Sequence, residues 1–175
     1  MGERQVMFVA KSGYTGHLFE EEVIGTPKIV SWQADGRRWK VLDCVEFAHR
    51  HQLTQHGPIA EQLRLKVAER LGVDGRRVLI YNTINTPFDF YLGADCFFEF
   101  QGTVVTCDAS LRNKGSYKAD VQIGEAIIGQ DGEPNQEEIN RLADQIAGQW
   151  HRNFRRFREV CTQRQGGGVL TWHPT

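Results

Sequence analysis

The chain has 175 residues, which is enough for one compact domain and too few for two full ones. Its composition, with 40% hydrophobic and 25% charged residues, is that of a globular protein and excludes a disordered or collagen-like chain. The 21 basic and 22 acidic side chains leave a formal net charge of −1. This balance argues against a protein held to nucleic acid mainly by bulk positive charge, although it leaves room for local basic patches.

The cysteines and the N-terminus predict a soluble, cytoplasmic protein. The four cysteines are scattered without the spacing of a zinc site, and free thiols fit a reducing compartment. The apolar part of the N-terminus is too short for a signal peptide. No apolar run approaches the ~20 residues of a membrane span, so we expect no membrane partner.

The N-terminal part carries strand-type residues, and we expect a β-rich extension over residues 1–56. Strands are predicted at Gln5–Ala10, Lys28–Trp32 and Arg38–Leu42. An Asp35-Gly36 pair separates the last two runs, which is a strong signal for a hairpin. A short helix follows, with Asp43 as N-cap and Glu46 three residues later, as in a capping box.

Residues 57–125 predict an amphipathic helix followed by strands. Gly57 is followed by a proline, which suits a first helical turn, and Gly72 ends the four-residue apolar repeat. Strands are predicted at Val78–Tyr81, Cys96–Phe100, Thr103–Cys107 and Lys118–Ile123. A Gln101-Gly102 turn joins the second and third strands, which we therefore expect to form a hairpin.

A long helix is predicted from about Gln136 to Thr162, within a C-terminal region of residues 134–164. Asn135 is placed as its N-cap, and three consecutive glycines end it before a tail, residues 165–175. The order of all these elements predicts a single domain with a mixed α/β fold, in which helices flank a central mixed sheet.

The predicted hairpin brings two carboxylates to one edge of the sheet. Asp95 precedes one strand and Asp108 ends the next, so the two side chains should lie side by side. Carboxylate oxygens suit Mg²⁺ or Mn²⁺, and such an ion activates water and neutralises charge on a phosphodiester. We therefore predict that Asp95 and Asp108 bind a divalent metal. The alternative is that both aspartates only cap backbone N–H groups at strand ends.

This order of a helix, three strands and two acidic residues resembles the core of the PD-(D/E)xK nuclease superfamily over roughly Pro58 to Ile123. The resemblance implies a restriction-endonuclease-like core that cleaves DNA or RNA with one or two divalent metal ions. Asp95 and Asp108 match its two acidic positions, with the Ala109 carbonyl as a further metal ligand. Glu61, in the first turn of the preceding helix, matches the family's helix glutamate.

The chain departs from that motif at its lysine, which belongs two residues after the second acid, where this chain has Ser110. Lys114, or Lys118 on the next strand, is the candidate to supply the ammonium group that orients or acidifies the attacking water. Asp89, just upstream, is a possible extra ligand. Because the lysine is displaced, the alternative to a nuclease is a non-catalytic nucleic-acid-binding or protein-interaction module on the same scaffold.

Basic residues concentrate near the end of the long helix. We expect four of them to form a ridge that contacts the phosphates of nucleic acid, namely Arg152, Arg155, Arg156 and Arg158. The alternative is that they lie on a solvated face and complement the helix dipole. The Arg37 to Lys40 stretch, which contains a tryptophan, is a second candidate for nucleic-acid contact. The long helix also permits pairing with a partner, including a homodimer.

Overall fold

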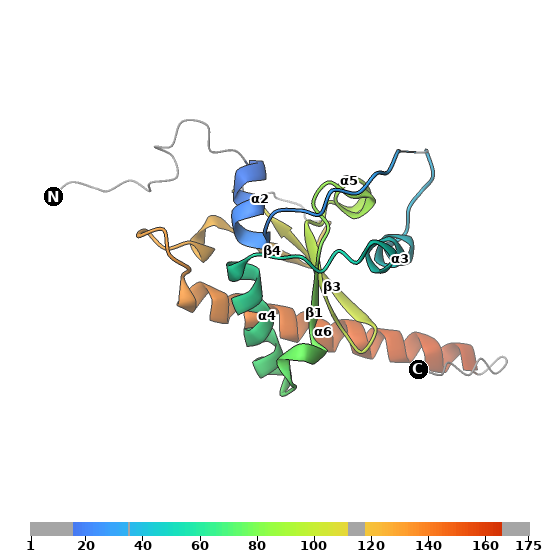
Figure 1. The fold of residues 1–175 in the computed structure, drawn as a ribbon. Coiled ribbons are helices and arrows are strands. Elements are labelled where there is room, and N and C mark those ends of the chain that lie inside the picture. Colours follow the sequence, from blue (N-terminus) through green and yellow to red (C-terminus); the bar gives the residue numbers. More distant parts are fainter. Residues whose placement is uncertain (1–15, 35, 112–117, 166–175) are drawn as a thin grey trace.

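The computed structural model describes residues 16–34, 36–111 and 118–165. It shows a mixed α/β fold in which one four-stranded sheet lies among helices (Figure 1). In chain order the elements are α2 (Gly16–Ile24), α3 (Val41–His51), α4 (Pro58–Leu71), η1 (Gly75–Arg77), β1 (Leu79–Asn82), α5 (Pro87–Leu92), β2 (Cys96–Phe100), β3 (Thr103–Ala109), β4 (Val121–Ile123), η2 (Glu125–Ile127) and α6 (Gln136–Gln165). None of the helices in these ranges combines the length and apolarity needed to cross a membrane.

The sheet has the strand order β1-β2-β3-β4, with antiparallel neighbours except for the parallel pair β3 and β4. The predicted β2–β3 hairpin is confirmed. Its turn residues, Gln101 and Gly102, have φ values of 49° and 68°, as in the two-residue turns that match strand twist. The turn fixes the register, in which Phe100 lies opposite Thr103 and Cys96 opposite Cys107.

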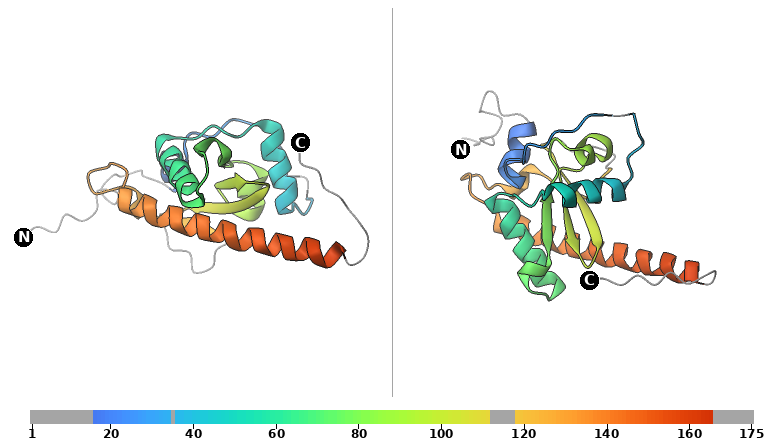
Figure 2. Two further views of the ribbon diagram at one scale, coloured as in Figure 1. Left: turned by 90° about the horizontal axis from the view of Figure 1, so that it is seen from below. Right: turned by 45° about the vertical axis from the view of Figure 1, so that its right-hand side comes forward.

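The two faces of the sheet bury two separate hydrophobic cores, because successive side chains of a strand point to opposite sides. Cys96, Phe98 and Phe100 of β2 pack with apolar residues of α2, α4 and α6. Phe97 faces the other way and packs with residues of α3 and α5. The sheet therefore lies between two layers of helices, which Figure 2 shows from two further directions.

Helix α6 is anchored to the sheet along its middle part. The Trp150 indole nitrogen donates to the Phe100 carbonyl oxygen (3.0 Å), and the Asn153 side-chain amide donates to the Val104 carbonyl oxygen (2.9 Å). The Trp150 ring stacks on Phe154, with 4.8 Å between centroids. Beyond these contacts the helix continues past the tip of the β2–β3 hairpin (Figure 1). The predicted N-cap is confirmed, because Asn135 Oδ1 accepts from the Glu137 backbone N–H (3.2 Å).

The prediction of a β-rich N-terminal extension is wrong for the described residues, since none of those before β1 is in a strand. Residues 28–32 form neither a helix nor a strand, and α3 begins at Val41, inside the predicted strand 38–42. The Lys40 backbone N–H donates to Asp43 Oδ2 (2.8 Å), so Asp43 stabilises the first turn of α3 from within it. The predicted strand at residues 5–10 and Asp35 of the predicted hairpin lie outside the described residues.

The end of α2 is held tightly against the start of α4. The Gly57 N–H donates to the Ile24 carbonyl oxygen (2.7 Å), and the Asn82 side-chain amide donates to the Gly25 carbonyl oxygen (2.8 Å). Gly25 has a φ of 111°, and a Cβ atom added there would lie 2.3 Å from the Gly57 nitrogen. Only glycine fits this close approach. The contact fixes the position of α2, which also packs against β3.

Candidate active site

The register of the hairpin places the two predicted aspartates side by side at the same edge of the sheet. Cys96 pairs with Cys107, and the Asp95 N–H also donates to the Cys107 carbonyl oxygen (2.9 Å), so Asp95 lies beside the residue that precedes Asp108. Both carboxylates are almost fully buried, with only 3% and 7% of the residue exposed. Asp95 Oδ2 accepts a hydrogen bond from the Ala109 backbone N–H (2.7 Å), which joins the start of β2 directly to the end of β3.

Buried threonines hold the backbone in front of Asp95. The Thr83 N–H donates to the Asp95 carbonyl oxygen, and the Thr83 hydroxyl donates to the Ala94 carbonyl oxygen, both at 2.8 Å. The Thr86 hydroxyl donates to the Thr83 carbonyl oxygen (2.6 Å) and accepts from the Phe88 N–H (3.2 Å). Thr86 is therefore the N-cap of α5, an element that the sequence interpretation missed, and the same contacts position Asp95.

Four carboxylates from four elements lie close enough to influence one another electrostatically. Burial, and then the negative charge of Glu20, raise the pKa of Asp95 to about 8, with smaller upward contributions from Asp89 and Asp108. The Ala109 N–H opposes this shift by stabilising the charged carboxylate. Burial, Asp89 and Asp108 also raise the pKa of Glu20, while nearby His17 lowers it. We call Glu20, Asp89, Asp95 and Asp108 the acidic cluster.

The acidic cluster has the chemistry of a site for a hard cation, because carboxylate oxygens are the ligands such ions prefer. Its members come from α2, α5, the residue that precedes β2, and β3. Among the described residues, no three His, Cys, Asp or Glu side chains surround one point closely enough to hold an ion as they stand. Binding an ion there would therefore require the side chains to move, and the charge of the ion would offset the burial and the repulsion that raise the pKa values of Asp95 and Glu20.

Glu20, and not the predicted Glu61, is the helix glutamate whose charge acts on Asp95. The carboxylate of Glu61 accepts from the Arg64 guanidinium through two hydrogen bonds of 2.7 Å and lies 2.6 Å from His56 Nε2. These hydrogen bonds, chiefly those from Arg64, lower the pKa of Glu61 to about 2. The charge of Glu20, not that of Glu61, acts on Asp95. The sequence signal that could have indicated a helix at Glu20 is the four-residue spacing of Phe19 and Val23, which are both buried in α2.

The lysine position of the motif is occupied by a buried serine. Ser110 is 9% exposed, and its N–H donates to the Ile123 carbonyl oxygen (3.0 Å). Lys114 lies outside the described residues. Lys118 is exposed, and its side chain lies against Gly93, where an added Cβ would be 3.7 Å from Lys118 Cδ. Lys118 thus lies beside the residues that precede Asp95, and it lines a cavity together with Ala94.

The four predicted arginines all have exposed side chains on α6. Two of them contact their own helix: Arg152 donates to Gln149 Oε1 (2.6 Å), and Arg155 Nε donates to the His151 carbonyl oxygen (3.4 Å). The Arg158 guanidinium lies 5.9 Å from the centre of the Phe154 ring. We call Arg152, Arg155, Arg156 and Arg158 the arginine ridge. The arginine ridge comes after Trp150 in the helix. Trp150 contacts Phe100 beside the hairpin turn, whereas Asp95 lies at the other end of β2, so the ridge lies away from Asp95.

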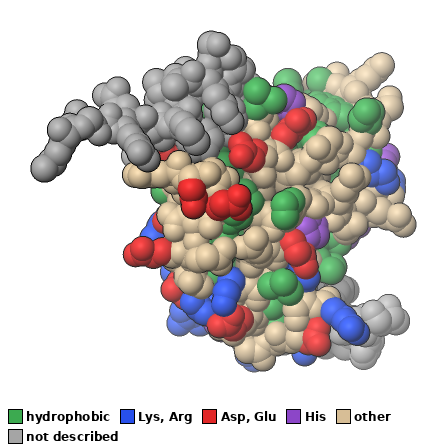
Figure 3. Space-filling view, turned by 60° about the vertical axis from the view of Figure 1, so that its left-hand side comes forward, with side chains coloured by type: hydrophobic (Ala, Val, Ile, Leu, Met, Phe, Trp, Pro, Cys, Tyr) green, Lys and Arg blue, Asp and Glu red, His purple; other side chains and the backbone are tan. Residues whose placement is uncertain are grey.

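The face that presents α2 carries many acidic side chains in its upper and middle parts, and most of its basic side chains lie lower (Figure 3).

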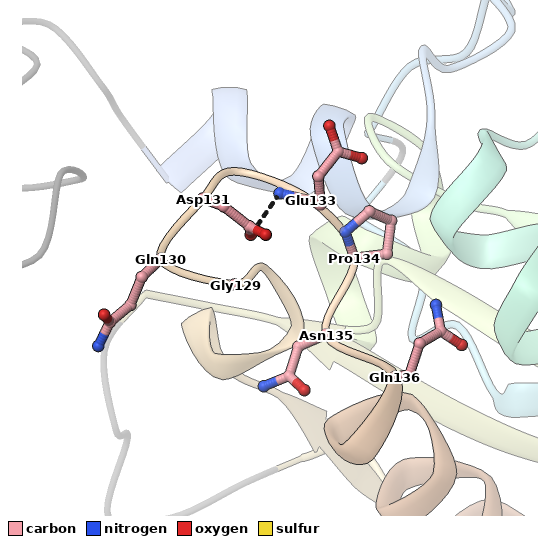
Figure 4. Close-up of a pocket in the computed structure, with 7 residues that line it drawn as sticks. All are labelled: Gly129, Gln130, Asp131, Glu133, Pro134, Asn135 and Gln136. Carbon is pink, nitrogen blue, oxygen red and sulfur yellow. Dashed lines mark hydrogen bonds between the residues drawn. The ribbon is translucent and has the colours of Figure 1, made fainter.

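An open hollow of about 440 Å³ lies in the segment 129–136, at the start of α6 (Figure 4). Its polar side chains support the loop itself, since Asp131 Oδ1 accepts from the Glu133 N–H (3.1 Å) and Asn135 caps α6. We assign no ligand to this hollow.

Comparison with protein-family models, curated proteins and solved structures gives no match for this chain. The function must therefore be argued from the site itself.

Proposed function

We propose that this protein is a divalent-metal-dependent nuclease that cleaves the phosphodiester bonds of DNA or RNA, on a core related to the PD-(D/E)xK superfamily. The observation that carries the proposal is the acidic cluster, in which burial and mutual repulsion raise the pKa values of Asp95 and Glu20. Strongly perturbed carboxylates that converge from separate elements are typical of functional sites. A helix glutamate beside two aspartates of an antiparallel hairpin also fits the pattern of that superfamily.

Each residue of the site has a definite role in this proposal. Asp95 and Asp108 would hold Mg²⁺ or Mn²⁺, and Glu20 and Asp89 would complete the set of oxygen ligands. The bound ion would supply Lewis-acid stabilisation of the phosphate and a more acidic water. Lys118 would orient that water, a role for which Lys114 stays a second prediction.

The second candidate function is a non-catalytic nucleic-acid-binding module on the same scaffold. Ser110 favours it, because a buried serine stands where the motif has its lysine. This candidate keeps the arginine ridge as a phosphate contact and gives the acidic cluster no catalytic role.

The proposal is tested by incubating the full chain with single- and double-stranded DNA and RNA in Mg²⁺, in Mn²⁺ and in EDTA. We expect cleavage only with a divalent ion, and we expect the same ion to raise the melting temperature because it binds the folded state. Absence of cleavage with every substrate and ion, together with an unchanged melting temperature, would refute the nuclease. Salt-sensitive binding without cleavage would favour the second candidate.

The arginine ridge predicts a change in salt dependence. Replacing Arg155 and Arg156 with glutamine should weaken binding to nucleic acid and reduce the slope of log K against log salt by roughly 0.7–0.9 for each lost phosphate contact. The matched control is Arg141→Gln, an exposed arginine of the same helix whose Nε donates to Glu138 Oε2 (2.7 Å). Fluorescence anisotropy over a range of salt concentrations measures both effects, and equal slopes for the ridge and control variants contradict the assignment.

A further inference from the structure

Four aromatic side chains from two separate segments form a continuous cluster beside α5. Trp32 and Trp39 come from the segment between α2 and α3, and Phe90 and Tyr91 come from α5. The Trp32 ring lies 5.6 Å from that of Phe90, and Phe90 lies 4.9 Å from Tyr91. Trp39 stacks nearly parallel to Tyr91, at 6.0 Å and 13°. We call these four residues the aromatic surface.

The aromatic surface is accessible and held in place. Phe90 is 65% exposed, and both tryptophans are partly exposed. The Trp32 indole N–H donates to the Asn85 carbonyl oxygen (2.7 Å), which fixes the orientation of its ring. Rings that are fixed before a ligand arrives lose little conformational entropy on binding. A large exposed phenylalanine among ordered aromatic rings is typical of a binding surface.

Basic groups accompany the aromatic rings. The Arg37 guanidinium lies 4.2 Å from the centre of the Trp39 ring, and Arg38 and Lys40 are exposed on either side of that tryptophan. Cations interleaved with aromatic rings match the two parts of a nucleotide strand, because the rings stack on bases while the cations attract phosphates. This charge complementarity favours nucleic acid over an apolar protein segment.

Helix α5 connects the aromatic surface to the acidic cluster. Asp89 on this helix acts on the pKa values of Asp95 and Glu20, and Phe90 is the next residue. A cavity of about 290 Å³ lies between α5, the start of α3 and the sheet, and is lined by Val41, Phe88, Leu92, Ala94, Thr106 and Lys118. Ala94 directly precedes Asp95. Helix α5 therefore carries a member of the acidic cluster, Asp89, and two members of the aromatic surface, Phe90 and Tyr91.

We propose that the aromatic surface stacks on unpaired bases, so that the substrate is single-stranded nucleic acid or a single-stranded segment of a larger one. In a duplex the base faces are already stacked on their neighbours and cannot reach Phe90 or Trp39. Stacking tolerates any base sequence, because every base has a π-face. The inference rests on the proposed nuclease function for the cleavage that would follow binding, but binding itself needs no metal.

Binding in EDTA separates the two proposals, because it excludes metal-dependent cleavage. The wild-type chain, Phe90→Ala and Trp39→Ala are titrated with a fluorescent oligothymidylate and with a blunt duplex of the same length. We expect the wild type to prefer the single strand about tenfold or more, and each substitution to weaken single-strand binding about tenfold and duplex binding little. The control is Leu65→Ala, an apolar residue of α4 that is 48% exposed, because α4 packs on the opposite face of the sheet from α3 and α5.

Equal affinity for duplex and single strand, or an unchanged single-strand affinity in both Phe90→Ala and Trp39→Ala, overturns the inference. Binding of neither nucleic acid also overturns it and indicates a protein partner for the surface. Unchanged melting temperatures show that the variants are folded. A preference for single strands without any metal-dependent cleavage would support this inference and refute the nuclease. Metal-dependent cleavage of duplex without that preference would support the nuclease and overturn this inference.

Discussion

Replacing Asp108 with asparagine is expected to lower the rate of metal-dependent cleavage at least about 100-fold, since even residues that only support a metal ligand cost 10–100-fold when changed. The substitution keeps the size of the side chain and removes one of the two opposed carboxylates at the edge of the hairpin. The measurement is single-turnover cleavage at saturating enzyme. Glu137→Gln, which removes an exposed charge from the first turn of α6, is the matched control and should cleave at the wild-type rate.

The same assay distinguishes the two helix glutamates. Glu20→Gln should lose activity to an extent comparable with Asp108→Asn, because the Glu20 charge belongs to the acidic cluster. Glu61→Gln should retain activity and lose only a little stability, because it removes a partly exposed ion pair with Arg64. If Glu61→Gln abolishes cleavage while Glu20→Gln does not, the placement of the helix glutamate is wrong.

Replacing Asp95 with asparagine is expected to stabilise the metal-free protein at alkaline pH. The pKa of Asp95 is about 8 in the folded state against an ordinary value of 3.8, so between these values the folded protein keeps a proton that the unfolded chain has lost. Stability should therefore fall as pH rises from about 4 to about 8, by as much as about 5 kcal/mol. Asparagine carries no charge and can still accept from the Ala109 N–H, so the variant should lack this loss.

Thermal melts in EDTA at pH 6 and pH 9 measure the effect. At pH 9 we expect Asp95→Asn to melt roughly 10 °C above the wild type, and at pH 6, which lies midway between the two pKa values, by roughly half as much. Mn²⁺ should then raise the melting temperature of the wild type and not that of the variant. A wild type that is as stable at pH 9 as at pH 6 would mean that its surroundings do not raise the pKa of Asp95.

Local patterns were enough to predict much of this fold. The hairpin follows from two apolar runs around Gln101-Gly102, and α4 follows from a regular repeat between Gly57 and Gly72. The strand predicted at residues 38–42 was wrong because a short run with tryptophan, valine and leucine suits a helix as well as a strand. Tertiary packing decides such cases. Val41 and Leu42 begin α3, in which Cys44, Phe47 and Ala48 are buried at helical spacing.

The candidate site also contains residues that local patterns predict and residues that they do not. Asp95 precedes β2 and Asp108 lies near the end of β3, and a two-residue turn joins these strands, so their proximity could be predicted from strand geometry alone. Glu20 lies far away in sequence and reaches them only because the Gly25–Gly57 contact docks α2 beside the sheet. No local pattern carries that information. Glu61 illustrates the opposite error: its position in a first helical turn was suitable, but Arg64 and His56 already hold its carboxylate.

The position of the arginine ridge sets a minimum length for any ligand that uses the whole molecule. Strand β2 separates Asp95 at one end from Phe100, which contacts Trp150, at the other. Its five residues span about 17 Å at ~3.3 Å per residue, and the ridge begins only after Trp150. A ligand that contacts both the acidic cluster and the arginine ridge must therefore be longer than about 17 Å, so a shorter fragment would contact only one of the two.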